Sequence, residues 1–449
     1  MNTKTRVVCY HSVDVFLDNL KAFDVSSNPY GSYAYLSVFL KHHPNGNYYF
    51  FDIFENEKKI AIVPFECSID SKLFRVKYFR FVGYMNSTNY EQYICRDDDM
   101  LKVHNIFIAY LNEQQYRVII NYYDINSASP LYSILTDSEL KKSVNYLYVC
   151  PCLRFSDNFD EFFKGAFPAS KKRTELKKFQ RKLFEIGDMR MVNIDDEESY
   201  KKNKLYIDQI YRVHSERFAD VYATSFFGSP KKRPYYSELI ESLMKGHNGF
   251  LSLLVLDEVV IAFILCLTNG EVLVDWIPAF DPSFSKYSLG IVQYKMLFEE
   301  LCSPNYSYKV FDYSKGSSVY KRKWAKEETA NYQFVVRLKR SNIFSLFIYC
   351  FETNRFKLKC YFRRKGLLKK AKILIGRVLA WRRKDNNAVS NIDRRYVETA
   401  QADKVFKYSD IISYPVNVRE DVLNSLYNGE RLQSIEKKDG KVIITYSKQ

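Results

Sequence analysis

An internal repeat constrains the fold more than any other feature of this sequence, because both halves predict the same order of helices and strands. For the first half, these are a helix near 32–42, strands near 48–54, 59–65 and 74–83, a helix near 100–113, a strand at 117–122, a helix near 128–135 and a strand at 145–150. For the second half, they are 235–245, 250–256, 259–267, 272–277, 290–301, 309–313, 317–324 and 331–338. A duplicated α/β unit explains this order most simply.

The composition predicts a globular protein of two or three domains. The chain has 449 residues, of which 47% are hydrophobic and 16% aromatic, so it is too apolar to be largely disordered. The first residues lack an apolar segment followed by a small-residue cleavage site, and we therefore expect a cytoplasmic location. Nine cysteines lie singly apart from Cys150 and Cys152, and six histidines show no zinc-site spacing, so we expect neither a disulfide framework nor a metal.

The net charge of +16 is concentrated in two segments. Thirteen Lys and Arg residues lie between 341 and 385 against Glu352 and Asp385, which makes this segment +11. A second cluster lies on a helix predicted near 170–186, where the seven cations from Lys171 to Lys182 have Glu175 as the one acid among them. Such segments are typical of contacts with anionic partners, although a charged helix face is most often only solvated.

The order of elements within each repeat is similar to that of a GNAT acyltransferase unit. In that fold the third strand and the next one separate, and the following helix receives the pyrophosphate of coenzyme A at its N-terminus. In the second half this region reads FDPSFSKYSLG (280–290), and its predicted cofactor-binding residues are Lys286, Tyr287, Ser288, Leu289 and Gly290. Asp97, Asp98 and Asp99 precede the matching helix of the first half and would repel a phosphate, so we expect a cofactor site only in the second.

Several motifs from about residue 29 to 338 resemble the CelD-like acetyltransferases associated with cellulose and other exopolysaccharide synthesis, which are similar to the Fem-type aminoacyl transferases. The matching segments are KKIAIVPF (58–65), SKKRTELKKFQRKLFEIG (170–187), HSERF (214–218), YSLG (287–290) and FDYSKGSSVYKRKWA (311–325). The last segment follows the family pattern Asp-Phe-x-x-Gly-x-x-x-Tyr-Lys, with Tyr313 in place of the usual Phe.

The resemblance implies a set of site residues around the turn at 312–324. Asp312 would orient the acceptor or take its proton, Tyr320 would protonate the leaving thiolate or bind the cofactor arm, and Lys321 would bind the 3′-phosphate or an acidic substrate group. Asp275, an acid within an apolar strand, is a second candidate base. The predicted substrate-binding residues are His214, Arg217, Lys315 and Trp324.

Structural roles remain open for the same residues. Asp312 could cap the turn that follows its strand, and Asp275 could be a satisfied buried carboxylate. Lys321 could belong to a solvated face, and Arg217 could form an ion pair with Glu216 or Asp220.

We predict an N-terminal GNAT-like unit without a cofactor site (1–152), a GNAT acyltransferase unit (153–340), a basic amphipathic helical extension (341–390) and a small α/β appendage (391–449). The appendage predicts a helix near 419–427 and a strand at 442–446. No run in the extension approaches the roughly 20 uncharged apolar residues of a membrane span. The segment 341–384 therefore suits peripheral contact with an anionic membrane, or packing on its own domain.

Three functions are compatible with these observations. The first is an acyl-CoA-dependent N-acyltransferase, with acetyl-CoA as donor and a small-molecule or glycan-precursor acceptor such as an amino sugar of the cell envelope. The second uses aminoacyl-tRNA, bound by the basic helix at 170–186, although the paired-helix insertion of the tRNA-using relatives is not evident. The third is a non-enzymatic, membrane-associated module of a polysaccharide-synthesis system.

Overall fold

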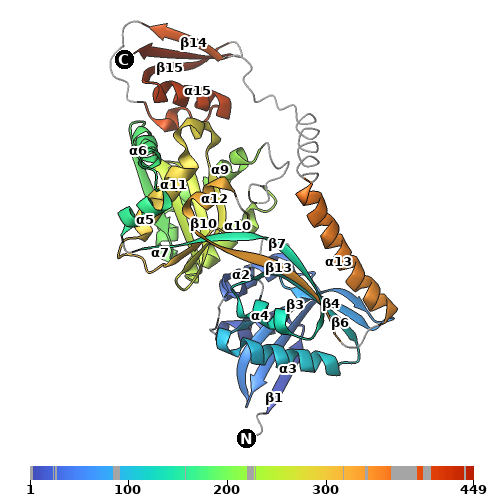
Figure 1. The fold of residues 1–449 in the computed structure, drawn as a ribbon. Helices are drawn as coiled ribbons and strands as arrows, with labels where there is room; N and C mark the ends of the chain where they lie inside the picture. Colours follow the sequence, from blue (N-terminus) through green and yellow to red (C-terminus); the bar gives the residue numbers. More distant parts are fainter. Residues whose placement is uncertain are drawn as a thin grey trace.

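A computed structural model describes residues 4–23, 25, 28–83, 90, 92–156, 158–219, 227, 229–316, 318–338, 342–365, 392–397, 406–438 and 441–448. The predicted α/β fold of two GNAT-like units is confirmed (Figure 1). The first half contains β1 (Thr5–Tyr10), α1 (Val13–Ala22), η1 (Pro29–Gly31), α2 (Tyr33–His42), β2 (Tyr48–Glu55), β3 (Lys58–Ser71), β4 (Val76–Phe81), β5 (Ile94–Cys95), η2 (Asp97–Asp99), α3 (Met100–Glu113), β6 (Arg117–Asn126), α4 (Pro130–Asp137) and β7 (Lys141–Arg154).

The second half repeats the series from α2 to β7 after an inserted set of helices and one strand. The insertion contains α5 (Phe159–Ala166), α6 (Ser170–Phe184), β8 (Met189–Ile194), α7 (Glu197–Lys202), α8 (Lys204–Ile207) and α9 (Ile210–Arg217). The repeat consists of α10 (Arg233–Lys245), β9 (Gly249–Leu256), β10 (Val259–Asn269), β11 (Val272–Phe280), η3 (Pro282–Tyr287), α11 (Leu289–Leu301), β12 (Val310–Asp312), α12 (Val319–Trp324) and β13 (Glu327–Arg337).

The two units exchange their last strands. The sheet has 13 strands in the order β1-β2-β3-β4-β6-β13-β7-β12-β11-β10-β9-β8, with β5 paired to β3. Strand β13 of the second half therefore lies between β6 and β7, while β7 of the first half pairs with β12. The division predicted at residue 152 falls inside β7 and does not separate two sheets, because each unit is completed by a strand from the other.

The C-terminal part packs against both units and does not form a separate appendage. It contains α13 (Ile343–Arg364), β14 (Ile392–Val397), η4 (Tyr408–Asp410), α15 (Val416–Tyr427), β15 (Glu430–Lys438) and β16 (Lys441–Lys448). Helix α13 packs on β6, β7 and β13, and residues 366–390 of the predicted extension lie outside the described residues. Val418, Val422 and Tyr446 share one core with Ile261 and Val292 of the second unit. Among the described helices, none has the length and apolar composition needed to cross a bilayer.

Candidate active site

The candidate site is the point where β11 and β12 separate, and the order of elements in the sequence predicts this separation. The two parallel strands pair at only three positions, from Val272 with Val310 to Val274 with Asp312. Beyond Val274 the pairing between β11 and β12 ends, and β11 also carries a bulge where it faces Leu265 and Cys266 of β10. Backbone N–H groups on a strand edge that lacks a partner can donate to a bound carbonyl group, and bulges are common beside active sites.

Asp275 follows directly at this separation and is almost fully buried, with 2% of its surface exposed. Its Oδ2 accepts a hydrogen bond of 2.7 Å from the Tyr294 hydroxyl, whereas its Oδ1 has no partner among the described residues. Burial raises the pKa of Asp275 to about 6, while nearby Lys321 opposes this shift and Asp312 adds to it. A carboxylate with a raised pKa and one free oxygen is suited to accept a proton near neutral pH.

Asp312 has both carboxylate oxygens engaged. Oδ2 accepts a 2.6 Å hydrogen bond from the Tyr90 hydroxyl, and Oδ1 accepts one of 2.7 Å from the backbone N–H of Ser314. Burial of the carboxylate raises its pKa, although the residue retains some exposed surface. The turn-capping role is therefore present, and Asp275 is the better placed proton acceptor of the two.

The side chains of Lys321 and Tyr320, both on α12, lie close to Asp275 at the separation of β11 and β12. The Lys321 ammonium donates to the carbonyl oxygens of Tyr313 at 2.6 Å and Lys315 at 3.1 Å. This inward position fits charge stabilisation at the strand separation better than the predicted contact with a 3′-phosphate. The Tyr320 ring stacks on Tyr294 with centroids 5.7 Å apart, and burial raises its pKa, so the hydroxyl stays protonated at neutral pH.

The first unit contributes a third buried carboxylate, Asp124 of β6, which the sequence reasoning missed. Its oxygen accepts hydrogen bonds from the hydroxyl of Tyr148 and from Asn331 Nδ2, and its φ of 62° is left-handed. Burial raises its pKa to about 6, against the opposing charge of Lys315. Asp124 could have been found by the same sequence feature that indicated Asp275, which is an acid within an otherwise apolar strand.

A row of polar side chains runs across the adjacent strands at which the two units meet. Asn331 of β13 accepts from Cys150 of β7 at 3.4 Å and lies beside Asp124, while Asp312 of β12 and Asp275 of β11 continue the row. Five adjacent strands thus carry buried polar groups in the middle of the sheet. Only the exchange of β7 and β13 brings these residues together.

The predicted cofactor-binding residues form the corner between β11 and α11. Ser288 is left-handed with φ 51°, and Lys286 is exposed. A Cβ at Gly290 would lie 2.9 Å from the Phe280 ring, so glycine is needed here for packing. Tyr287 is buried and donates to the carbonyl of Leu423 at 2.9 Å, and Leu289 is buried too. The side chains of Tyr287 and Leu289 therefore support the corner and do not line it.

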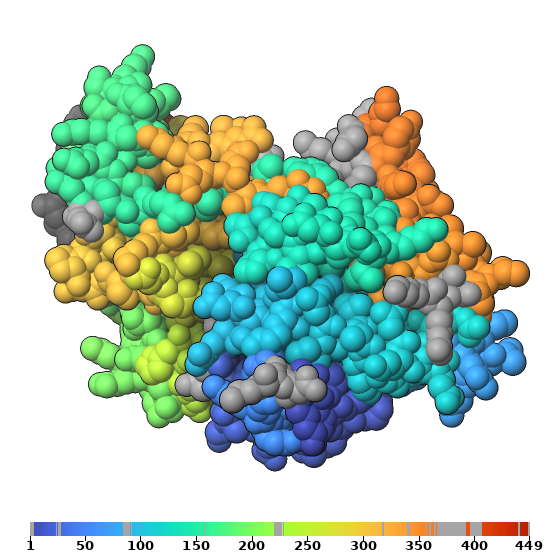
Figure 2. All heavy atoms as spheres, turned by 60° about the horizontal axis from the view of Figure 1, so that its bottom comes forward, coloured from blue at the N-terminus to red at the C-terminus, as the bar shows by residue number. Residues whose placement is uncertain are grey.

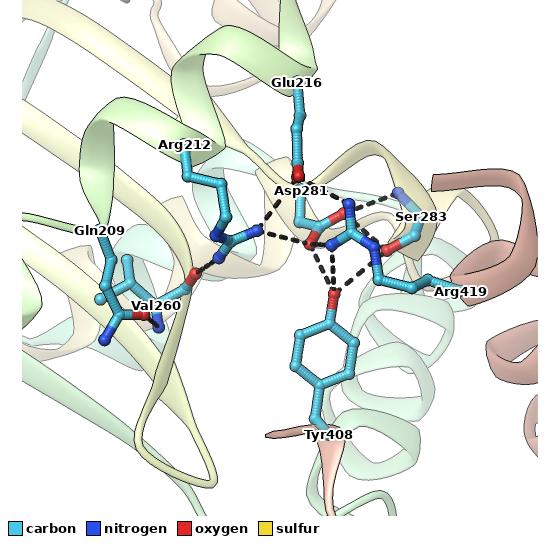
Figure 3. A network of polar contacts seen from close by, with 8 residues as sticks. All are labelled: Gln209, Arg212, Glu216, Val260, Asp281, Ser283, Tyr408 and Arg419. Carbon is cyan, nitrogen blue, oxygen red and sulfur yellow. Dashed lines mark hydrogen bonds and ion pairs between the residues drawn. The ribbon is translucent and has the colours of Figure 1, made fainter. Parts of the chain in front are cut away.

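A buried ionic network attaches the C-terminal segment to the same corner (Figure 3). Arg419 of α15 pairs with Asp281 at 2.5 Å and with Glu216 of α9 at 2.8 Å. The Tyr408 hydroxyl donates to Asp281 at 2.5 Å, and Asp281 also accepts from the N–H and hydroxyl of Ser283, which fixes the start of η3. The sequence gives no sign of this network, because its members lie up to about 200 residues apart.

The predicted substrate-binding residues have different surroundings. Arg217 lies 4.5 Å above the Phe280 ring and so beside the corner. Its predicted partner Glu216 pairs with Arg212 and Arg419 instead, and Asp220 lies outside the described residues. Burial lowers the pKa of His214 to about 4 within an aromatic pocket. Lys315 is exposed near Asp124.

Trp324 is a core residue. It is 1% exposed and packs against Phe162, Phe167 and Phe298, with ring centroids 6.1, 4.7 and 5.1 Å away. Direct contact with a substrate, as predicted, does not fit this position.

The predicted basic helix is confirmed as α6, and its cations Lys171, Lys172, Lys177 and Lys178 are exposed.

The duplicated fold, the separated strands β11 and β12 and the helix that begins beside them define a GNAT-type acyltransferase. The family described as "Acetyltransferase (GNAT) domain" matches residues 170–322, roughly a third of the chain, and this region contains every predicted site residue except Trp324. No curated protein matches the sequence. The CelD-like relationship remains a prediction.

Similar solved structures include proteins of several activities. FemX has a TM-score of 0.47 and 10% identity, over 73% of this chain and 97% of that one. L-PGS from Bacillus licheniformis has a TM-score of 0.42 and 14% identity, over 71% and 95% of the two chains. A tandem GNAT protein from the clavulanic acid biosynthesis pathway has a TM-score of 0.39 and 8% identity, over 76% and 100%. Similarities this distant do not bear on donor or substrate.

Proposed function

We propose that the protein is an acyl-CoA-dependent N-acyltransferase, with acetyl-CoA as donor and an amino sugar or another cell-envelope or exopolysaccharide precursor as acceptor. The observation that carries this proposal is the free Oδ1 of Asp275, a buried carboxylate at the point where β11 and β12 separate. A buried oxygen without a partner is costly unless a ligand group binds it. An acceptor amine is such a group.

The residues present fit a coenzyme A donor. The thioester supplies an activated acyl group. Lys286 and Arg217 place positive charge at the corner between β11 and α11, where a pyrophosphate would bind. Asp275 would take the proton of the attacking amine, and the protonated Tyr320 hydroxyl would donate to the leaving thiolate. The unpaired edge of β11 beyond Val274 would hold the carbonyl oxygen.

The same site could serve an aminoacyl-tRNA donor, because the exposed cations of α6 form a surface suited to RNA phosphates. A coenzyme A donor needs only the corner residues, whereas a tRNA donor also needs α6. The cytoplasmic location expected from the sequence suits either donor.

We expect the protein to bind acetyl-CoA in calorimetric titration, and Lys286→Glu to weaken binding by about tenfold, since a charge-assisted contact contributes about 1.5 kcal/mol or more. Lys286 is exposed, so this variant should fold normally. Gly290 is a poor position for such a test, because any side chain would collide with Phe280. Lys141→Glu, at an exposed lysine on β7, is the matched control and should bind as the wild type does.

Binding that is equal in both variants would place the donor elsewhere. A protein that ignores acetyl-CoA but binds aminoacyl-tRNA, with affinity that falls steeply as salt rises and is lost in Lys177→Glu/Lys178→Glu, would establish the second donor instead.

A further inference from the structure

Helix α13 is apolar on two opposite faces. One face packs on the sheet of the first unit, where Ile348 is 4% exposed and Ser345 is 1% exposed. The other face points to solvent and carries large apolar side chains at helical spacing: Ile343, Leu346, Phe347, Phe351, Leu358, Tyr361 and Phe362, all at least 36% exposed. A helix that serves only as a cover for a sheet has a polar outer face, so this outer stripe needs another explanation.

A turn of the first unit continues this stripe. Between β3 and β4 the chain reads Lys72-Leu73-Phe74-Arg75, with Leu73 84% exposed and Phe74 42% exposed. Phe74 stacks on Phe344 of α13, with ring centroids 4.2 Å apart. Two elements almost 270 residues apart in sequence thus present apolar side chains at one edge of the molecule, where Figures 1 and 2 show α13 beside the first unit.

The exposed charged side chains of the turn 72–75, and those of α13 that the structure describes, are all positive. Lys72 and Arg75 flank the turn, and Lys357 and Lys365 are exposed on α13. Glu352, the only acid in α13, is buried on the packed side and pairs with Arg355 at 3.0 Å. From residue 353 to 384 the sequence holds thirteen Lys and Arg residues and no acid.

We propose that the outer face of α13 and the turn 72–75 together form a docking surface for an anionic lipid bilayer. Aromatic and aliphatic side chains bordered by cations match the interfacial region of a bilayer, where rings lie at the headgroup level and lysines reach the phosphates. The structure supports a lipid surface over RNA because the exposed groups are mainly apolar, and an RNA site would need cations and stacking rings in a polar groove. This docking would hold the acyl-transfer site near membrane-bound substrates.

The test is sedimentation of the full-length protein with phosphatidylglycerol-containing vesicles and with pure phosphatidylcholine vesicles. We expect binding only to the anionic vesicles, and weaker binding as salt rises. Phe347→Ser/Phe351→Ser and Leu73→Ser/Phe74→Ser should each lower partitioning by about tenfold or more, because each pair removes two groups that bury apolar surface in the bilayer. Lys72→Glu/Arg75→Glu should lower binding to anionic vesicles as well.

Two controls keep the test decisive. Leu205→Ser removes an apolar side chain of α8 that is 83% exposed, and Lys177→Glu/Lys178→Glu reverses charge on α6; both should bind vesicles normally. If a double variant loses stability, Leu73→Ser alone tests the surface, since that side chain is largely in water. Equal binding to both vesicle types, loss only in the α6 variant, displacement by RNA, or a dimer that the α13 variant converts to monomer would each overturn the proposal.

Discussion

Replacing Asp275 with asparagine is expected to abolish most acyl transfer and, at the same time, to stabilise the protein at neutral pH. A general base contributes roughly 100-fold or more to rate, and asparagine cannot accept the amine proton. The wild-type kcat/KM should rise with pH up to about 6, where the Asp275 carboxylate becomes deprotonated, and then level off. The variant should lose this limb of the pH profile, which steady-state assays with acetyl-CoA and a series of amine acceptors would measure.

The stability effect has the opposite sign because the folded state binds a proton to Asp275 more tightly than the unfolded state does. Its pKa is raised from 3.8 to about 6, so this carboxylate favours folding most at low pH and loses that contribution as pH rises through about 6. A shift of two units corresponds to at most about 3 kcal/mol. Urea unfolding should show the variant gaining about twice as much stability at pH 8 as at pH 5, because the penalty builds up between pH 3.8 and about 6.

Glu300→Gln provides the matched control for this pair of effects. Burial also raises the pKa of Glu300, but this residue lies near the far end of α11 and hydrogen-bonds Asn193. Its replacement should leave turnover and the pH profile unchanged. If the limb near pH 6 persists in Asp275→Asn, the base lies elsewhere and Asp312 is the next position to replace.

Replacing Arg419 with methionine should destabilise the protein by up to about 3–5 kcal/mol, since it removes the nearer and fully buried of the two cations that pair with Asp281 and leaves only Arg212, at 3.5 Å. Arg419 itself is fully buried, and its removal also frees Tyr408 and Glu216 from their shared partner (Figure 3). Urea unfolding would measure the loss, and limited proteolysis should cut the C-terminal segment first. Because Asp281 also fixes the start of η3, we expect the KM for acetyl-CoA to rise as well.

The double variant Arg419→Met/Asp281→Asn separates loss of the ion pair from the burial of a carboxylate that has lost its nearer cation. Removing both charges should recover much of the lost stability, because a buried pair contributes little beyond its own desolvation. Arg395→Met removes an exposed arginine from β14 and should have little effect. A double variant as unstable as the single one would show that packing of Arg419, and not its charge, holds the segment.

Local patterns were enough to predict the elements of each repeat. The basic helix predicted at 170–186 is α6, and the strand and helix on either side of the 313–318 turn are β12 and α12, because alternation and helical spacing are properties of neighbouring residues. The separation of β11 from β12 followed from the order of elements, and Asp275 from an acid in an apolar strand. Elements in less regular segments, such as β1, α1 and β8, were not predicted.

The sequence by itself therefore determined the repeated α/β unit, the position of its strand separation and the charge of its surfaces. Tertiary structure alone decided that β7 and β13 change places, that Asp124 joins Asp275 and Asp312 in one row, and that Arg419 reaches Asp281. Two further positions also depend on the tertiary structure: Trp324 lies in the core, and the Lys321 ammonium binds the backbone carbonyl oxygen of Tyr313. The physical reason is that strand pairing and buried ion pairs depend on groups distant in the chain, and such partners leave no periodic signal in the residues around them.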